Sequence, residues 1–386
     1  MLKARELLDR AELLTDPVQL VDRLLRAGLL LHASDVHLDP SADSTRVRFR
    51  IDGELEEVLR LPAPMQNPVV SRLKVLASLD IAERRAPQDG GFSWRLGGLA
   101  GAVPAAHDRG LAGAALDVRM ATLPVRHGER VTLRLLETGG RRLTLDDLGM
   151  SDGDRRLFDE VLERPHGLVL LTGPTGSGKT TTLYAAIGEL LKGEARNIIT
   201  VEDPIEYEIP GVAQAEVDSS DKVNFSKALK SILRHDPDVV MIGEIRDEES
   251  LDVAVKSALT GHLVLSTLHT SSAVGAVTRL RNMGLANHLI AATLRLAIAQ
   301  RLARRVCAAC GGKGCAACGG KGLVGRMGLF EVLRPDDAVS ALIADGANEA
   351  TVLAAARAAG FVTLADDARA KVAAGLTTEA EILKVV

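Results

Sequence analysis

The stretch "GPTGSGKTTTLY", residues 173 to 184, constrains the fold of this chain more than any other part of its sequence. It fits the pattern Gly-x-x-x-x-Gly-Lys-Ser/Thr, in which a glycine-rich loop lets backbone N–H groups surround a nucleotide phosphate. The apolar run "GLVLLTG" before it is typical of a strand buried on both faces, and "KTTTLYAAIGELLK" after it has helical apolar spacing. An ordinary glycine-rich turn is the alternative, but such a turn requires neither a buried strand before it nor a helix after it. The pattern therefore predicts an ATP-binding loop.

The predicted phosphate contacts come from this loop and from the first turn of the following helix. They are Gly173, Pro174, Thr175, Gly176, Ser177, Gly178, Lys179, Thr180 and Thr181. Lys179 is expected to reach the β- and γ-phosphates, and the hydroxyl of Thr180 to bind Mg2+. The positive end of the helix dipole favours the same negative charges. ATP and Mg2+ are thus the expected cofactors.

The second half of the chain continues as apolar strands alternating with helices. The runs "NIITVED", "DVVMIGE" and "HLVLSTL" follow the loop, and such runs imply a parallel sheet that is covered by helices on both faces. The expected fold of this half is α/β.

In the first half of the chain, the apolar residues follow a different periodicity. Apolar and polar residues alternate in "TRVRFRIDGELEEVLRL" and in "ALDVRMATLPVRHGERVTLRLLE", so two antiparallel hairpins are expected, the first turning at Asp52 and Gly53. A helix is expected after Asp16 and Pro17, and a long loop over the Gly/Ala-rich residues 95–116. With 386 residues the chain is long enough for several cores. The expected division is an α+β domain over 1–138, a linker over 139–150, and an ATPase domain over 151–386 with a helical tail at 335–386.

Three of the predicted strands are followed by polar residues, which is where ligands bind in open α/β sheets. Glu202 and Asp203 follow one strand, Glu244 another and His269 a third. Phosphoryl transfer needs one carboxylate to order the magnesium shell and another to position the attacking water. Solvated caps are the alternative for the carboxylates, and a hydrogen-bonded core side chain is the alternative for the histidine.

Arg119 and Arg134 are predicted to lie nearly opposite each other on the second hairpin, out of phase with its apolar residues. Like charges in that position repel unless an anion lies close to both. A γ-phosphate fits this requirement, which makes both residues candidate arginine fingers. Two solvated arginines on an open sheet face are the alternative.

The four cysteines of the chain all lie in "CAACGGKGCAACGGKG", residues 307 to 322, an eight-residue unit repeated in tandem. Each unit places two thiols as Cys-x-x-Cys before glycines, a spacing that lets both bind one metal ion. Cys307, Cys310, Cys315 and Cys318 together form the ligand set of a closed structural zinc site. Unligated thiols or disulfides are the alternatives.

The composition excludes other classes of protein. The formal net charge is −4 and only 2% of residues are aromatic, so neither the basic surface nor the stacking residues of a nucleic-acid binder are expected. The start "MLKARELLDRAELL" is charged and amphipathic, and no apolar run approaches the roughly 18 residues that span a bilayer. A cytoplasmic location is expected.

The motifs together resemble those of the secretion ATPases of type II secretion and type IV pilus assembly, the general secretory pathway protein E family. The resemblance extends from about "ASDVHLDP" to the C-terminus, nearly the whole chain. It includes "LDIAERRAPQDG", "STLHTSSA", "AQRLARRVC" and the tail "TLADDARAKVAAGLTTEAEILKVV". It implies a P-loop (RecA-like) ATPase domain after a PAS-like domain, and a homo-hexamer that is peripheral at the inner membrane. There it would act on a membrane platform protein to assemble a pseudopilus or pilus.

The resemblance also implies roles for individual residues. Glu202 and Asp203 match the family's acidic box, and Glu244 matches its variant Walker B motif, which binds magnesium. The remaining matches are His262 and His269 in the histidine box, Arg119 and Arg134 reaching the nucleotide from the preceding domain, and Arg234 and Arg246 near the phosphates or subunit contacts.

Two features depart from the family pattern. Secretion members usually carry a further N-terminal domain, whereas the resemblance here begins close to Met1. The two cysteine pairs are separated by four residues instead of a long loop. A DNA-uptake or conjugation ATPase, or a nucleotide-dependent scaffold with little turnover, are the alternative functions.

Overall fold

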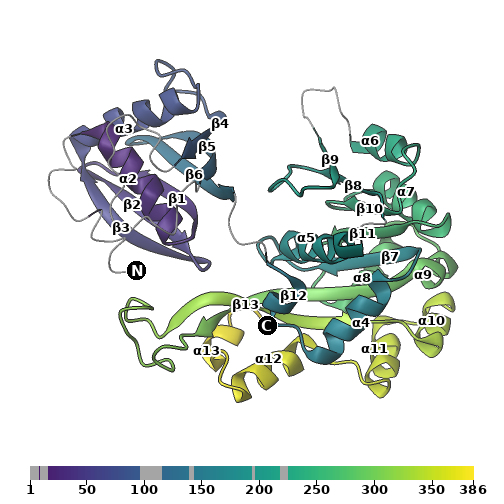
Figure 1. The fold of residues 1–386 in the computed structure, drawn as a ribbon. Helices are drawn as coiled ribbons and strands as arrows, with labels where there is room; N and C mark the ends of the chain where they lie inside the picture. Colours follow the sequence, from purple (N-terminus) through teal and green to yellow (C-terminus); the bar gives the residue numbers. More distant parts are fainter. Residues whose placement is uncertain (1–7, 9–15, 96–114, 139–142, 194–195, 218–224) are drawn as a thin grey trace. The chain divides into compact units, whose positions relative to one another are not determined.

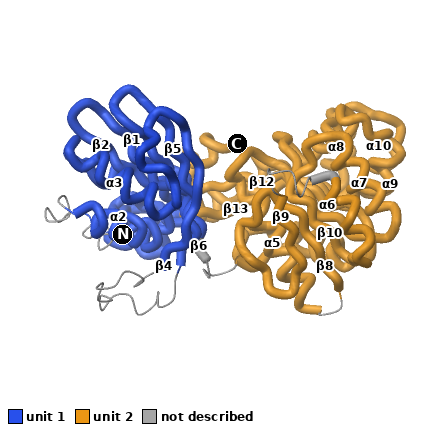
Figure 2. Tube along the Cα trace, turned by 90° about the horizontal axis from the view of Figure 1, so that it is seen from above, with its two compact units in different colours: residues 1–141, 306–325 blue, residues 142–305, 326–386 orange. Residues whose placement is uncertain are grey.

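The structure, a computed structural model, describes residues 8, 16–95, 115–138, 143–193, 196–217 and 225–386 (Figure 1). Its contacts divide the chain into two compact units, residues 1–141 with 306–325 and residues 142–305 with 326–386 (Figure 2). The cysteine segment, which we expected within the second domain, therefore groups with the first unit. The loop expected over 95–116 falls almost wholly outside the described residues.

The first unit is built on a six-stranded antiparallel sheet in the order β3-β2-β1-β6-β5-β4. Its strands are β1 (Ala33–Pro40), β2 (Ser44–Ile51), β3 (Glu54–Pro62), β4 (Gln88–Arg95), β5 (Ala115–Val125) and β6 (Gly128–Thr138). The helices α2 (Pro17–Leu30) and α3 (Ala63–Leu76) pack on one face of this sheet. The α+β class expected for this part of the chain is confirmed, whereas a PAS-like domain stays a prediction.

Both predicted hairpins form, and local sequence explains the turns. Asp52 and Gly53 join β2 to β3 with φ values of 50° and 89°, the left-handed pair that a two-residue hairpin turn requires. In the other hairpin, β5 and β6 meet at Val125 and Gly128, and Gly128 has a φ of 128°. Alternate residues of β5 and β6, among them Val118 and Leu133, are buried in the core beneath the helices.

The second unit contains a seven-stranded sheet in the order β13-β12-β7-β11-β10-β8-β9. The strands are β7 (Gly167–Thr172), β8 (Ile198–Glu202), β9 (Ala213–Glu216), β10 (Val239–Ile242), β11 (Leu263–Leu268), β12 (Leu294–Val306) and β13 (Leu323–Leu333). The pairs from β12 through β7 to β9 are all parallel. The parallel α/β sheet expected from the apolar runs is thus confirmed.

The parallel strands are buried on both faces, because successive residues belong to different cores. In β7, Leu168 and Leu170 pack with α7 (Glu248–Leu259) and α8 (Ala273–Asn282), whereas Val169 and Leu171 pack with α4 (Asp152–Leu162) and α5 (Lys179–Leu190). The remaining α-helices of the unit are α6 (Phe225–Ile232), α9 (Asn287–Thr293), α10 (Asp337–Ala344), α11 (Glu349–Ala358), α12 (Leu364–Ala373) and α13 (Glu379–Ile382).

The described part of the predicted linker is structured. Leu145–Leu148 forms a short 3-10 helix, and Leu145 and Leu148 are buried in the core that contains Phe158. Over the described residues, no helix is long and apolar enough to span a bilayer.

Candidate nucleotide-binding site

The glycine-rich loop lies between the end of β7 at Thr172 and the start of α5 at Lys179. Gly173, Gly176 and Gly178 have φ values of 147°, 78° and 89°, which side chains other than glycine rarely adopt. A Cβ atom at Gly173 would also lie 2.6 Å from the main-chain oxygen of Gln300. The loop therefore needs glycine both for its conformation and for the close approach of a neighbouring strand.

Lys179 begins α5 and is only 8% exposed. Its Nζ donates hydrogen bonds to the main-chain oxygens of Gly173 (2.8 Å) and Pro174 (3.1 Å). Burial lowers the pKa of Lys179, the carboxylate of Glu244 opposes that change, and the positive charge of Arg301 lowers the pKa further. A phosphate bound within this loop would replace two neutral acceptors by charged ones.

The hydroxyl of Ser177 is a further sign that the loop is built to hold a ligand. Ser177 is 4% exposed, and its Oγ has no hydrogen-bond partner among the described residues. A buried hydroxyl without a partner costs about 1–3 kcal/mol, and a phosphate oxygen in the loop would accept its proton. Thr180 and Thr181 are partly exposed in the first turn of α5, so the Thr180 hydroxyl is accessible for a metal ion. The residues present therefore fit a magnesium nucleotide.

The ends of four parallel strands align beside the loop. Thr172 at the end of β7 pairs with Leu268 of β11 and with Ala299 of β12, and Ile242 at the end of β10 pairs with Val201 of β8. Polar residues that follow these strands therefore share one edge of the sheet, as expected for ligand sites in parallel sheets.

Four of the predicted residues form one charged cluster at this edge. His269 Nε2 lies 3.1 Å from Glu244 Oε1, and Arg246 Nε lies 2.8 Å from Glu244 Oε2. Arg246 also lies 3.3 Å from Asp203. The side chain of Glu244 is 26% exposed, so it is oriented by its partners yet open to solvent. This arrangement suits a carboxylate that orders a metal shell or a water.

Glu202 ends β8 but is in a different environment, since it is 2% exposed. One of its oxygens accepts hydrogen bonds from Thr200 (2.6 Å) and Gln214 (3.1 Å), and the other accepts one from the hydroxyl of Tyr184. Burial and this bond raise the pKa of Tyr184, so the hydroxyl keeps its proton. Direct action of Glu202 on an attacking water would require one of these bonds to open.

The structure places His262 away from this cluster, at the other end of β11, and its predicted role in nucleotide binding stays a prediction. His262 precedes β11, and its main-chain oxygen accepts a hydrogen bond from Gly167 at the start of β7. The strand between His262 and His269 spans about 20 Å at 3.3 Å per residue. The ring nitrogen Nδ1 of His262 lies 3.0 Å from the main-chain oxygen of Ser257. The observed partner of the His262 ring is therefore the last turn of α7.

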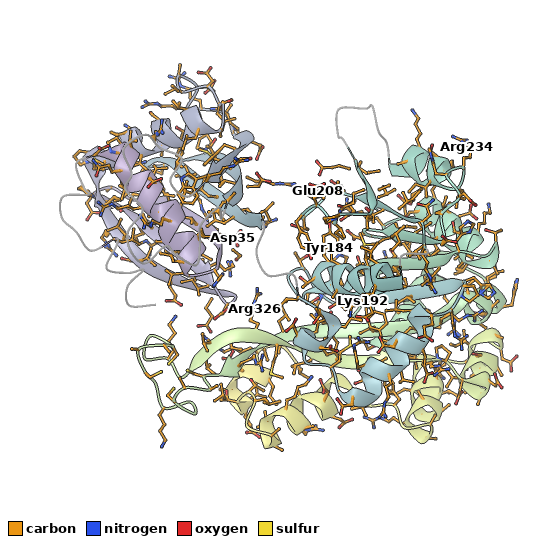
Figure 3. The ribbon with its side chains drawn as sticks, viewed as in Figure 1. Asp35, Tyr184, Lys192, Glu208, Arg234 and Arg326 are labelled. Carbon is orange, nitrogen blue, oxygen red and sulfur yellow. The ribbon has the colours of Figure 1, made fainter. Side chains whose placement is uncertain are left out.

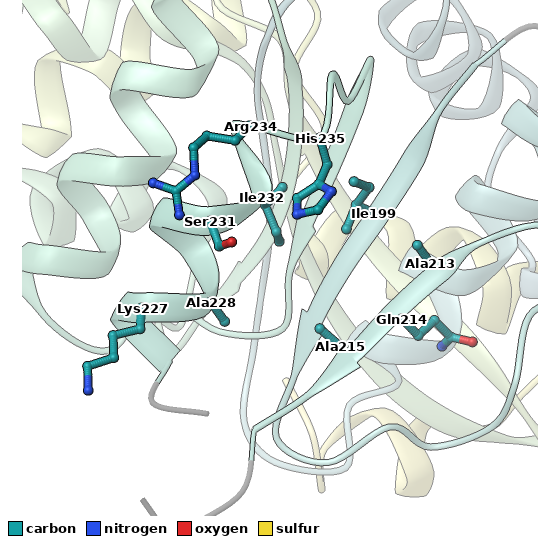
Figure 4. Close-up of a pocket in the computed structure, with 10 residues that line it drawn as sticks. All are labelled: Ile199, Ala213, Gln214, Ala215, Lys227, Ala228, Ser231, Ile232, Arg234 and His235. Atoms are coloured by element: carbon teal, nitrogen blue, oxygen red, sulfur yellow. The ribbon is translucent and has the colours of Figure 1, made fainter. Parts of the chain in front are cut away.

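Arg234 is also distant from the cluster. It follows α6 and lines a pocket of about 600 Å3 between that helix and the strands β8 and β9, together with Ile199, Ala215 and His235 (Figure 4). Figure 3 shows Arg234 well separated from Tyr184 on α5. Asn197, which precedes β8, holds the main-chain oxygen of His235 at 2.8 Å. This pocket therefore lies near the amino end of β8, away from the Glu244 cluster, and the expected position of Arg234 near the phosphates or subunit contacts stays a prediction.

Arg119 and Arg134 are directly opposite each other on β5 and β6, as predicted, and both are exposed. The protein itself supplies an anion beside one of them, because Asp35 of β1 lies 3.4 Å from Arg134, and it also lies 3.6 Å from Arg50. Their repulsion is therefore partly relieved within the first unit. Their action on a nucleotide stays a prediction.

The four cysteines come together as expected. All four Sγ atoms lie within 4.8 Å of one another. The two repeats face each other in a reciprocal way, because a Cβ atom at Gly314 would meet the main-chain oxygen of Gly320 (2.6 Å), and one at Gly322 would meet that of Gly312 (2.2 Å). The N–H groups of Cys315 and Gly322 donate to Cys318 Sγ at 3.1 and 3.2 Å. Such donors favour thiolate over thiol, so the cluster fits a divalent cation that binds thiolates.

Two residues beside the loop were missed by sequence reasoning. Gln300 and Arg301 lie on β12, next to the glycine-rich loop. The sequence signal that could have identified them is that Gln300 and Arg301 interrupt the apolar run "LRLAIAQRLA". A polar side chain that is buried in such a strand needs a hydrogen-bond partner.

Comparison with known proteins agrees with this geometry. The model of a family described as type II/IV secretion system protein matches residues 14–384. The type II secretion system protein E of Pseudomonas aeruginosa is 44% identical over 393 residues, covering 95% of this chain and 75% of that protein. The type IV pilus assembly ATPase PilB of Myxococcus xanthus is 48% identical over 293 residues, covering 76% of this chain and 49% of that protein.

Solved structures show the same fold. The pilus retraction motor PilT, solved with bound ADP, superposes with a TM-score of 0.59 at 27% identity, over 90% of this chain and 95% of that one. The ATPase DotB of Legionella pneumophila gives a TM-score of 0.72 at 24% identity, over 95% of this chain and 94% of that one.

Proposed function

The chain belongs to the family of type II/IV secretion system proteins, and we propose that it is a secretion ATPase that hydrolyses ATP to assemble a type II secretion pseudopilus or a type IV pilus. The observation that carries this proposal is the position of the Glu244, Asp203, Arg246 and His269 cluster at the same sheet edge as the glycine-rich loop. Binding groups and a solvent-accessible carboxylate at one edge are what phosphoryl transfer to water requires.

Each part of the site has a defined task in this reaction, in which water attacks the γ-phosphorus and ADP leaves. Lys179 exchanges its bonds to loop oxygens for bonds to phosphate oxygens, and the loop N–H groups hold the β-phosphate. Glu244, oriented by His269 and Arg246, positions the water or the metal shell. Thr180 and Glu244 would hold Mg2+, which neutralises charge that develops on the phosphate oxygens.

We further propose that Cys307, Cys310, Cys315 and Cys318 hold one Zn2+ in a structural role. Four thiolates complete a tetrahedral shell and leave no position for water. From the family we propose two kinds of partner: further copies of the same chain, forming a hexamer, and a platform protein of the inner membrane. The hexamer would lie at the cytoplasmic side of that membrane.

The ATPase proposal is tested by measuring phosphate release with Mg2+ and ATP. Lys179→Ala should abolish nucleotide binding and turnover, because it removes the buried cation of the loop. Lys192→Ala is the matched control: this lysine lies in the short 3-10 helix, Leu191–Gly193, that follows α5, and its side chain is 64% exposed. Turnover that survives in Lys179→Ala, or is lost equally in the control, would contradict the site.

A further inference from the structure

The glycine-rich loop lies against the neighbouring strand β12, where Gln300 and Arg301 make the nearest approaches. Ala299 of β12 pairs with Thr172, the last residue of β7, so Gln300 and Arg301 continue along the loop. A Cβ atom at Gly173 would lie 2.6 Å from the main-chain oxygen of Gln300, and one at Gly178 would lie 2.7 Å from its side-chain Nε2. Gln300 therefore limits the space at both ends of the loop.

Gln300 also connects the loop to the helix that follows it. The side chain is 1% exposed, and its Oε1 accepts a hydrogen bond from Thr182 Oγ1 at 2.8 Å. Thr182 lies in the first turn of α5, three residues after Lys179. The backbone of β12 and the start of α5 are thus held together beneath the phosphate site.

Arg301 extends from this dipeptide to the loop that carries His269. Its Nη2 donates to the main-chain oxygen of Ser271 at 2.9 Å, and its Nη1 donates to that of Gln300 at 2.9 Å. Nη1 also lies 3.0 Å from the position of a Cβ atom at Gly173. One guanidinium thus lies close to the start of the glycine-rich loop and donates a hydrogen bond to the segment after β11.

The position of Arg301 also has an electrostatic consequence. Its positive charge lowers the pKa of Lys179, in addition to the larger effect of burial. Burial lowers the pKa of Arg301 itself, while the carboxylate of Glu331 opposes that change. Two cations held close together in a partly buried site create a potential that an anionic ligand relieves.

We propose that Arg301 is a positioning residue of the ATP site, which holds the His269 segment against the glycine-rich loop and adds its charge to that of Lys179 in attracting the triphosphate. This inference rests on the proposed function of the loop. Because the guanidinium donates its hydrogen bonds to main-chain oxygens, we assign it a role through the loop and through its charge. It is therefore distinct from the arginine fingers expected at Arg119 and Arg134.

The test compares Arg301→Gln and Arg301→Lys in the full chain. Arg301→Gln removes the charge, so the Kd for ATP should rise about tenfold, and the Kd for AMP should rise less because AMP carries fewer charges. Arg301→Lys keeps the charge but loses the planar pair of N–H donors. Its Kd for ATP should stay within about twofold of wild type while kcat falls several-fold, since the His269 segment is held less firmly. Arg305→Gln is the matched control, because Arg305 is an exposed arginine on the same strand.

Three results would overturn the proposal. Wild-type Kd and kcat in Arg301→Gln, with only a lower melting temperature, would leave Arg301 a purely structural role. An equal loss in Arg305→Gln would show a non-specific effect of surface charge. Equal changes of Kd and kcat in Arg301→Lys and Arg301→Gln would show that the charge of Arg301 and the geometry of its N–H donors have no separate effects. Lys179→Ala separates a failure of the proposed ATP site from a failure of the proposed role of Arg301, because ATP binding that survives in Lys179→Ala contradicts the ATP site itself.

Discussion

Glu202 and Glu244 show how two carboxylates at one sheet edge acquire different chemistry from their surroundings. Glu202 is buried and accepts hydrogen bonds from Tyr184, Thr200 and Gln214. Glu244 contacts two side chains that can carry positive charge, and it remains partly exposed. A water or a metal ion can therefore approach Glu244 without breaking a buried network, whereas approach to Glu202 requires rearrangement.

This contrast predicts the effect of Glu244→Gln. The amide keeps the size of the side chain but loses the negative charge that orders a metal shell or an attacking water. Hydrolysis should fall by about 100-fold, with the Kd for ATP changed by less than about threefold. Phosphate release and equilibrium binding measure the two quantities. Glu248→Gln is the control, because Glu248 is an exposed carboxylate in the first turn of α7; equal turnover in both variants would remove Glu244 from the site.

Arg119 and Arg134 yield a second prediction. If they act as fingers on the nucleotide, Arg119→Ala and Arg134→Ala should each lower kcat by about tenfold or more and raise the Kd for ATP much less, since such residues act on transition-state charge. Arg60→Ala is the control, because Arg60 is an exposed arginine on β3 of the same sheet. Full turnover in both single variants would favour the alternative, in which Asp35 and solvent satisfy the two arginines.

At the scale of elements, the accuracy of sequence reasoning depended on how local each signal is. The turn at Asp52 and Gly53 is specified by two adjacent residues, and the burial of β7 by six consecutive apolar ones. The position of His262 depends on the register of β11 against β7, which joins residues about 100 apart in the chain. A histidine before the strand and one after it look alike in the sequence, but the parallel sheet places them at opposite edges.

The site residues follow the same rule. Lys179 and Thr180 are part of one contiguous motif, and Glu244 follows a strand that is apparent from its composition. Arg301 was missed because its role arises from the pairing of β12 with β7 and from one hydrogen bond to Ser271. No spacing within the sequence indicates either contact.

The cysteine segment yields a prediction about a whole element. Elemental analysis of protein purified without added metal should find about one zinc per chain, because four thiolates complete one shell. Cys307→Ser should lose the zinc and make residues 305 to 325 more sensitive to protease, while ATP binding persists. Ala308→Ser, at an exposed position in the same repeat, is the control and should retain the metal. Metal-free wild-type protein with a protease-resistant segment would refute a structural zinc.

At the scale of the whole molecule, the predicted site residues are divided between the two compact units. The second unit holds the glycine-rich loop and the Glu244 cluster, whereas Arg119 and Arg134 belong to the first. Residues 306–325 leave the second unit between β12 and β13 and group with the first. The chain therefore passes between the two units three times, at 141/142, 305/306 and 325/326.

Assembly is the last property that this organisation predicts. We expect a closed ring of six chains, as proposed above, because identical subunits with unlike contact surfaces form rings when the rotation closes. A non-hydrolysable ATP analogue that binds only the assembled form should favour it by mass action. Sedimentation with Mg2+ and the analogue should then give about six times the 40.9 kDa mass of one chain. Lys179→Ala is the matched control and should respond less to the analogue, since it binds the analogue poorly. A wild-type protein that sediments as a monomer at high concentration with saturating analogue would contradict the ring.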